Sequence, residues 1–278
     1  MRNHTLPDVQ GGMAAETVSL DKVGVCNVLM PVAVHTVKGS DVRVTAKVSA
    51  YCSLNESQRG AHMSRFPLTI LDTLREHSVA SDFLNQVPCR LRDSQGAEDA
   101  YIKLRFPYEL DNISPVSGFN GPVFADVVLE SSVKGSDPVR KFITVTHQVI
   151  AVCPCSKELS IAAWDDLGEH GAPHMQRSYV SVTAEFDDPL IWVEDLISVI
   201  EEAAPSPHFI VKRPDEQAMA LTAWKNTNFV EDINRTIAQQ LEPRTDIIDY
   251  VIVVRNEETI HPFDVVAVRC KGLPGGLR

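Results

Sequence analysis

Apolar and polar positions alternate through the first part of the chain, and the period then changes in a definite order. Residues 20–35 and 41–54 are rich in Val and Thr, and VRVTAKVSAY alternates strictly between apolar and polar residues. A turn around Gly39 separates the two runs, so we expect a β-hairpin. Two stretches with helical spacing and then two further strand-like runs follow, at residues 65–77, 78–87, 100–110 and 122–133. The predicted order is β-β-α-α-β-β.

The same order begins again after a turn at residues 133–138. Strand patterns lie at residues 141–152 and 177–186, helical patterns follow at 189–203 and 215–242, and two more strand patterns lie at 247–256 and 262–270. Phe229, Ile233, Ile237 and Leu241 predict one apolar stripe on the last helix. The chain therefore predicts an α+β fold of two similar modules, each an antiparallel four-stranded sheet with a helix pair on one face.

The repeat sets the expected domain limits. We expect an N-terminal arm at 1–18, a first module at 19–136 and a second module at 137–278. Each sheet has edge strands that must be covered or paired. Joining modules edge to edge into a ring pairs these edge strands, so the pattern favours a homo-oligomer.

Composition and charge narrow the class of protein. The chain has 278 residues and a net charge of −11, and this acidity argues against nucleic-acid binding, which needs phosphates neutralised by Lys and Arg. The longest apolar stretch, residues 23–34, is too short to span a membrane. The N-terminus lacks the apolar core of a targeting segment. We therefore expect a cytoplasmic protein without membrane partners, in which six scattered cysteines do not form a disulfide framework.

The sequence CPCSKELS places Cys153 and Cys155 at the predicted end of a strand. The simplest interpretation is two ordinary thiols. Three features favour a reactive or metal-binding site instead. A strand end is exposed, Pro154 limits the conformations between the two thiols, and the charge of nearby Lys157 favours a thiolate. A disulfide between the two would close a small strained ring. A metal ligand and a nucleophile both remain open.

Other side chains of the second module could contribute to such a site. His174, Glu216 and His261 are metal-ligand types, but each alone is more often structural, and their spacing matches no short zinc motif. Four basic residues lie near these points in the sequence: Lys157, Arg177, Lys212 and Arg213. They are either solvated charges or a pocket for an anion with several charges, such as a triphosphate.

Five segments in this order, CPCSKELS, HMQRS, VKRPDE, NFVEDINR and NEETIHPFD, resemble GTP cyclohydrolase I of type IB, and PDVQ and GAHMSRF agree near the N-terminus. The resemblance spans nearly the whole chain. It implies the tunnelling fold, with tandem ββααββ modules, and a homotetramer with sites near subunit interfaces. It also implies conversion of GTP and water to 7,8-dihydroneopterin triphosphate and formate, the first step of folate and pterin biosynthesis.

The resemblance also implies the site. A divalent metal (Zn, Mn or Fe) would be held by Cys153, His174, Glu216 and His261. Such an ion activates water for attack at C8 of guanine.

Further roles are implied for side chains around that ion. Cys155 and Glu258 are the acid–base candidates, beside Cys153, and Glu231 would hold the N1 and 2-amino edge of guanine. The triphosphate would bind mainly either to Lys157, Arg177 and Arg213 or to residues of a neighbouring subunit such as Arg65, and the sequence leaves this choice open.

The chain departs from the family pattern at two places. Phe263 replaces the second His of HPHD, and residues 161–173 are longer than usual. We expect this stretch, with Asp165, Asp166, Glu169 and His170, to be a solvated loop. Two alternatives are a deazaguanine nitrile reductase of the same fold, with a nucleophilic Cys and no metal, and a purine- or pterin-binding ring protein without catalysis.

Overall fold

The structure is a computed structural model and describes residues 8–167 and 171–272. Eight strands form one sheet in chain order, β1 to β8. The strand pairs β1–β2, β2–β3, β6–β7 and β7–β8 are antiparallel. The predicted α+β class with antiparallel strands is therefore confirmed. The chain divides into two compact units, described in turn below.

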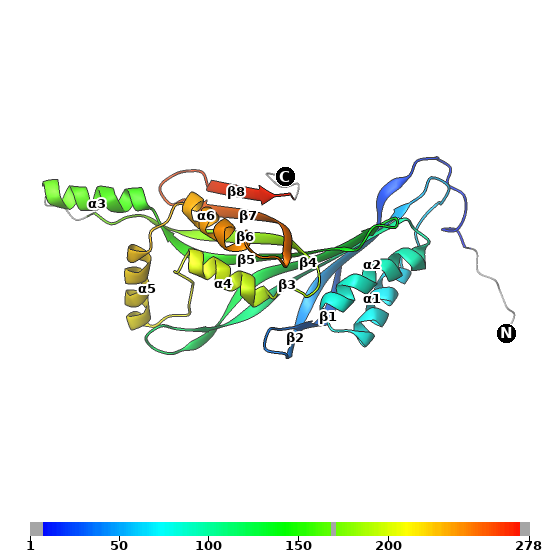
Figure 1. Cartoon of the computed structure of the whole chain (residues 1–278), viewed down its shortest axis with the longest axis horizontal. Helices are drawn as coiled ribbons and strands as arrows, with labels where there is room; N and C mark the ends of the chain where they lie inside the picture. Colours follow the sequence, from blue (N-terminus) through cyan, green and yellow to red (C-terminus); the bar gives the residue numbers. More distant parts are fainter. Residues whose placement is uncertain (1–7, 168–170, 273–278) are drawn as a thin grey trace. The chain divides into compact units, whose positions relative to one another are not determined.

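The first unit comprises Met1–Phe106, Val128–Phe142 and Asp188–Leu190. Its hairpin consists of β1 (Leu20–His35) and β2 (Asp41–Leu54), and it is followed by α1 (Arg65–Glu76) and α2 (Ser81–Gln95). The two helices pack on each other and on the hairpin strands (Figure 1).

The helix pair buries only some of its large apolar side chains. Phe66, Ile70 and Phe83 are fully buried, whereas Leu68 and Leu71 are exposed. The helix expected at residues 65–77 therefore forms at Arg65–Glu76, with Leu68 and Leu71 on its solvent-exposed side.

The second unit comprises Pro107–Val127, Ile143–Asp187 and Ile191–Arg278. Three strands have residues in both units: β3 (Asp99–Ile113), β4 (Asn120–Lys134) and β5 (Arg140–Val152). The other elements of the second unit are α3 (Pro154–Leu167), β6 (Met175–Phe186), α4 (Val193–Ala203), α5 (Arg213–Lys225), α6 (Val230–Leu241), β7 (Ile247–Glu257) and β8 (Val265–Lys271). Helix α6 packs on α4 and on strands β7 and β8.

The stripe on α6 is confirmed at three of its four positions. Ile233, Ile237 and Leu241 are buried, but Phe229 precedes the helix and is 44% exposed. The expectation that Phe229 belongs to the core is therefore wrong, and the ring is available to line a pocket.

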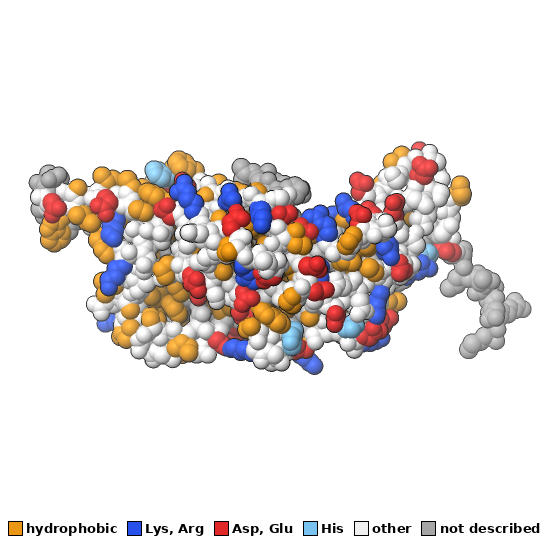
Figure 2. All heavy atoms as spheres, viewed as in Figure 1, with side chains coloured by type: hydrophobic (Ala, Val, Ile, Leu, Met, Phe, Trp, Pro, Cys, Tyr) orange, Lys and Arg blue, Asp and Glu red, His pale blue; other side chains and the backbone are white. Residues whose placement is uncertain are grey.

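The prediction of a loop at residues 161–173 is wrong for its first part, up to Leu167, because α3 occupies Pro154–Leu167. Its apolar side chains Leu159, Ile161 and Trp164 are exposed, and Figure 2 shows hydrophobic side chains along this helix. Glu169 and His170 lie outside the described residues. The limits 1–18, 19–136 and 137–278 remain a prediction from the repeat.

No helix in the described ranges is both long and apolar enough to cross a membrane. Lys, Arg, Asp and Glu side chains are intermixed on the face seen in Figure 2.

Candidate active site

A pocket of about 200 Å³ in the second unit brings together residues that lie far apart in the sequence. Its walls come from the end of β5, the start of β6, the first turn of α6, and the end of β7 with the loop that follows. Five of the predicted site residues line it: Cys153, His174, Glu231, Glu258 and His261. The pocket contains both polar side chains and the apolar Phe229, Val230 and Val265.

Cys153 lies between the end of β5 and the start of α3. Its Sγ accepts a hydrogen bond from the backbone N–H of Ser156 at 3.5 Å, and its carbonyl accepts one from the N–H of Lys157 at 3.1 Å. The sulfur therefore faces the N-terminus of a helix, where free N–H groups favour a negatively charged ligand. Pro154 at the first helical position fits this start, because its missing N–H is not needed there.

His174 is tied to the same segment. The backbone N–H of Cys153 donates to the carbonyl of His174 at 3.4 Å, and the N–H of His174 donates to Oγ of Ser156 at 3.3 Å. These contacts bring a cysteine and a histidine 21 positions apart in the numbering to one wall of the pocket.

The His174 ring is oriented by a buried side chain that the sequence analysis did not assign. Its Nδ1 lies 2.8 Å from Oε1 of Gln176, and Nε2 of Gln176 donates to Oε1 of Glu258 at 3.3 Å. Nδ1 of His174 also lies 3.8 Å from Oε2 of Glu258. The side chains of His174 and Glu258 are 11% and 6% exposed, so this small network is largely shielded from water.

His261 reaches the pocket from the loop after β7. Its ring stacks on Phe263, with centroids 5.0 Å apart and planes 5° apart. Stacking uses the face of the imidazole and leaves the nitrogens at its edge available. Phe263 thus supports His261 by ring contact.

Glu231 lies in the first turn of α6 and is exposed toward the pocket. The neighbouring Asp232 makes the local cap, since its Oδ2 accepts a hydrogen bond from the N–H of Phe229 at 3.1 Å. The carboxylate of Glu231 is therefore not needed to cap the helix.

A polar atom without a partner points to a polar ligand. Asn256 lines the pocket and is 3% exposed, and its Oδ1 has no hydrogen-bond partner among the described residues. An unpaired buried acceptor costs about 1–3 kcal/mol. The pocket is thus better suited to a polar occupant than to an apolar one.

Several predicted residues do not line this pocket. Glu216, Lys212 and Arg213 are exposed at the start of α5. Cys155 is exposed on α3. No three Cys, His, Asp or Glu side chains in the described ranges stand close enough together to hold a metal ion as they are.

The remaining basic residues have other contacts. Nζ of Lys157 donates to the carbonyl of Trp224 at 2.9 Å, near the end of α5. Arg177 is exposed and pairs in register with Glu257 across β6 and β7. Arg65, in the first unit, donates to the carbonyl of Ser94 at 2.7 Å.

Asp215, next to Glu216, anchors the start of α5. It is fully buried and accepts hydrogen bonds from the backbone N–H groups of Val116, Ser117 and Lys212 at 2.8–2.9 Å. Burial alone would raise the pKa of its carboxyl, but the hydrogen bonds outweigh burial and hold the pKa well below its ordinary value. Asp215 thereby fixes the helix that presents Glu216.

We expect Asp215→Ala to lower the midpoint of thermal unfolding by about 5 °C at neutral pH. A folded-state pKa below the unfolded value gives stability that is fully present above about pH 5 and is lost as the pH falls below about 4. Unfolding of the wild type and the variant, followed by circular dichroism across this range, should show the two curves converging in acid. A constant difference at all pH values would contradict this role.

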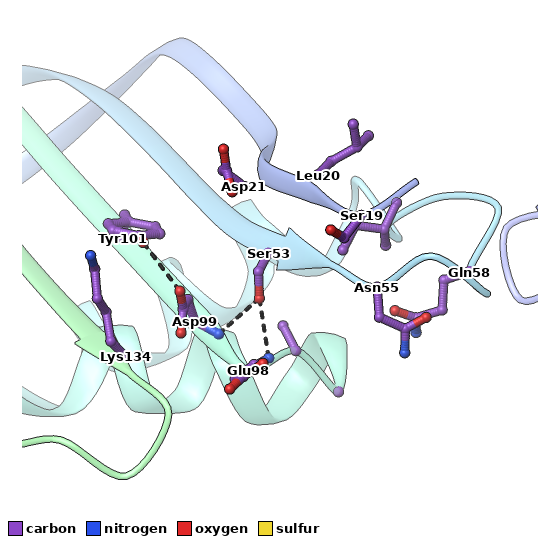
Figure 3. A pocket seen from close by; sticks show the side chains of 13 residues that line it. Ser19, Leu20, Asp21, Ser53, Asn55, Gln58, Glu98, Asp99, Tyr101 and Lys134 are labelled. Carbon is purple, nitrogen blue, oxygen red and sulfur yellow. Dashed lines mark hydrogen bonds between the residues drawn. The ribbon is translucent and has the colours of Figure 1, made fainter. Parts of the chain in front are cut away.

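A second, larger pocket, of about 630 Å³, lies in the first unit. Figure 3 shows Ser53, Asp99 and Tyr101 in its wall, where Ser53 accepts hydrogen bonds from the N–H groups of Glu98 and Asp99. It is lined by none of the predicted site residues.

The chain matches a known protein family over most of its length. A family model described as type I GTP cyclohydrolase folE2 matches residues 6–267. The chain belongs to the FolE2 family of type I GTP cyclohydrolases. The resemblance inferred from CPCSKELS and the later motifs is confirmed.

Individual relatives agree with this FolE2 membership. GTP cyclohydrolase FolE2 of Geobacter metallireducens is 32% identical over 95% of this chain and 96% of its own length. GTP cyclohydrolase FolE2 of Magnetococcus marinus is 34% identical, with both chains covered completely.

Solved structures show the fold of this FolE2 member. The uricase of Arthrobacter globiformis has a TM-score of 0.55 at 8% identity, covering 93% of this chain and 95% of the uricase. A uricase described as from Bacillus fastidious has a TM-score of 0.52 at 7% identity, with 91% and 93% covered. At this identity the likeness shows the fold alone, and it confirms the predicted tunnelling fold.

Proposed function

We propose that the chain hydrolyses GTP at C8 of guanine and rearranges it to 7,8-dihydroneopterin triphosphate with release of formate. The observation that carries this proposal is the pocket that joins Cys153, His174 and His261 to Glu231 and Glu258. The family membership supports the same reaction. Neither the nitrile reductase nor a binding protein without catalysis is supported by the relatives, which are named GTP cyclohydrolases.

The donor set of the pocket suits a divalent metal. One thiol and two imidazoles are ligands of Zn and related ions, and a carboxylate such as Glu216 would complete a set of mixed donors. The orientation of His174 by Gln176 fits a ligand, because metal-binding histidines usually donate their second ring nitrogen to a neighbour. Since no three such groups among the described residues stand at coordination spacing, the proposal requires the side chains to close on the ion. A divalent cation bound there supplies activation of water by a Lewis acid.

The side chains around the pocket would bind GTP and move its protons. Glu231 offers two acceptor oxygens for the two donors of guanine, N1–H and the 2-amino group. Glu258, whose Oε2 lies 3.8 Å from Nδ1 of His174, would transfer protons at the imidazole half of the base. Cys155 remains an acid–base candidate from the sequence.

The triphosphate needs cations that the pocket lining lacks. Lys212 and Arg213 at the start of α5 offer charge beside the N–H groups of a helix N-terminus, a favourable place for phosphate. Lys157, Arg177 and Arg65 are retained as further candidates. We propose a homotetramer in which a neighbouring subunit contributes to this part of the site.

Metal dependence tests the proposal. Protein stripped of metal and resupplied with Mn²⁺ or Zn²⁺ without oxygen should release formate and a fluorescent pterin from GTP, and a chelator should stop both. Metal bound without formate, with either ion, would overturn the proposed reaction.

A further inference from the structure

Gln176 lies inside the candidate site and is largely shielded from solvent. It is the second residue of β6 and is 6% exposed, whereas the next residue, Arg177, is exposed. Successive side chains of a strand point to opposite faces, so Gln176 shares its face with the buried Ser178 and Val180. A buried amide must have its hydrogen bonds satisfied by defined partners.

Both ends of the Gln176 carboxamide have partners, and the two partners belong to different parts of the proposed reaction. On one side lies Nδ1 of His174 at 2.8 Å, and on the other lies Oε1 of Glu258 at 3.3 Å. His174 is a proposed metal ligand and Glu258 a proposed proton-transfer group.

The chemistry of these groups fixes the direction of each bond. A carboxylate only accepts hydrogen bonds, so the NH₂ end of Gln176 must face Glu258. The carbonyl end then faces His174, and a carbonyl only accepts, so Nδ1 of His174 must carry a proton. The Nε2 lone pair of His174 is thereby left for another partner.

We propose that Gln176 is a positioning residue that sets the tautomer of His174 and holds the carboxylate of Glu258 in place. This inference rests on the proposed function, which assigns those two residues their roles. The short direct distance supports it: Nδ1 of His174 is only 3.8 Å from Oε2 of Glu258. Without the amide between them, the imidazole and the carboxylate would pair with each other and Glu258 would turn from its place.

Two substitutions separate the two halves of the proposal. Gln176→Glu keeps an acceptor for His174 but removes the donor to Glu258 and places a second carboxylate beside it. We expect it to bind Mn²⁺ within about threefold of the wild type and to lower kcat by about 100-fold, with little change in KM. Gln176→Leu removes both contacts and should weaken Mn²⁺ binding by about 10–100-fold as well.

Mn²⁺ affinity of the metal-free protein is measured first, by titration and without GTP. Steady-state kinetics at saturating Mn²⁺ follow. Matched changes at Gln239, an exposed residue of α6 outside the pocket, serve as controls, and Gln239→Glu and Gln239→Leu should leave both quantities unchanged. Circular dichroism confirms that each variant folds, and if Gln176→Leu does not fold, Gln176→Glu still tests the role of Gln176 toward Glu258.

Gln176→Leu with wild-type Mn²⁺ affinity would overturn the role at His174, and Gln176→Glu with wild-type kcat would overturn the role at Glu258. A wild type that binds Mn²⁺ but does not turn over GTP would instead refute the proposed function. The affinity measurement does not depend on that outcome.

Discussion

Cys153→Ala is expected to lower the rate of formate release from GTP by about 10³-fold or more. The substitution removes the sulfur that faces the pocket at the start of α3, and with it the softest donor of the proposed metal set. Loss of several kcal/mol of transition-state stabilisation corresponds to this factor. The measurements are kcat at saturating metal and the metal content of the purified protein.

The matched control for this prediction is Cys26→Ala, an exposed cysteine in β1 of the first unit. It should retain activity and metal content. Cys155→Ala should have a smaller effect than Cys153→Ala, because Cys155 is exposed on α3 and does not line the pocket. Full activity in Cys153→Ala would remove this residue from the site.

Glu231→Gln is expected to reduce kcat/KM for GTP by about 100-fold. The change replaces one acceptor oxygen by an NH₂ group that would face a donor of guanine, so a charge-assisted pair becomes a mismatch. The kcat/KM for inosine triphosphate, which lacks the 2-amino group, should fall less from wild type to variant than the kcat/KM for GTP does. Steady-state kinetics with both nucleotides provide the comparison.

Glu202→Gln on α4 is the control for the charge change, since Glu202 is exposed and outside the pocket. Equal losses for GTP and inosine triphosphate in Glu231→Gln would show that the carboxylate does not contact the 2-amino group. An unchanged kcat/KM for GTP would exclude Glu231 from substrate binding.

Alternation and helical spacing were sufficient to predict the strands and the buried face of α6. They failed at α3, because CPCSKELS has no clear apolar period. The signal was Pro154, which favours the first position of a helix, after a residue whose side chain can accept a hydrogen bond. The prediction of a strand end therefore missed the most informative feature of Cys153, which is its place at the N-terminus of a helix.

The motifs indicated Cys153, His174, His261 and Glu231, but single-residue reasoning could not find Gln176 or Asp215. Gln176 gains its meaning from the register of β6 with β7, which brings it beside Glu258. Asp215 gains its meaning from backbone N–H groups about 100 positions earlier in the chain. Both are long-range contacts that local patterns do not encode. The role of Glu216 as a metal ligand remains a prediction from the family motif.

GTP labelled with ¹³C at C8 gives the most direct test of the central claim. The metal-loaded protein is incubated with this substrate, and carbon NMR follows the label while fluorescence follows the pterin. The account predicts that the label appears in formate, one formate for each pterin formed. Label that stays in the nucleotide, or pterin formed without labelled formate, would contradict it.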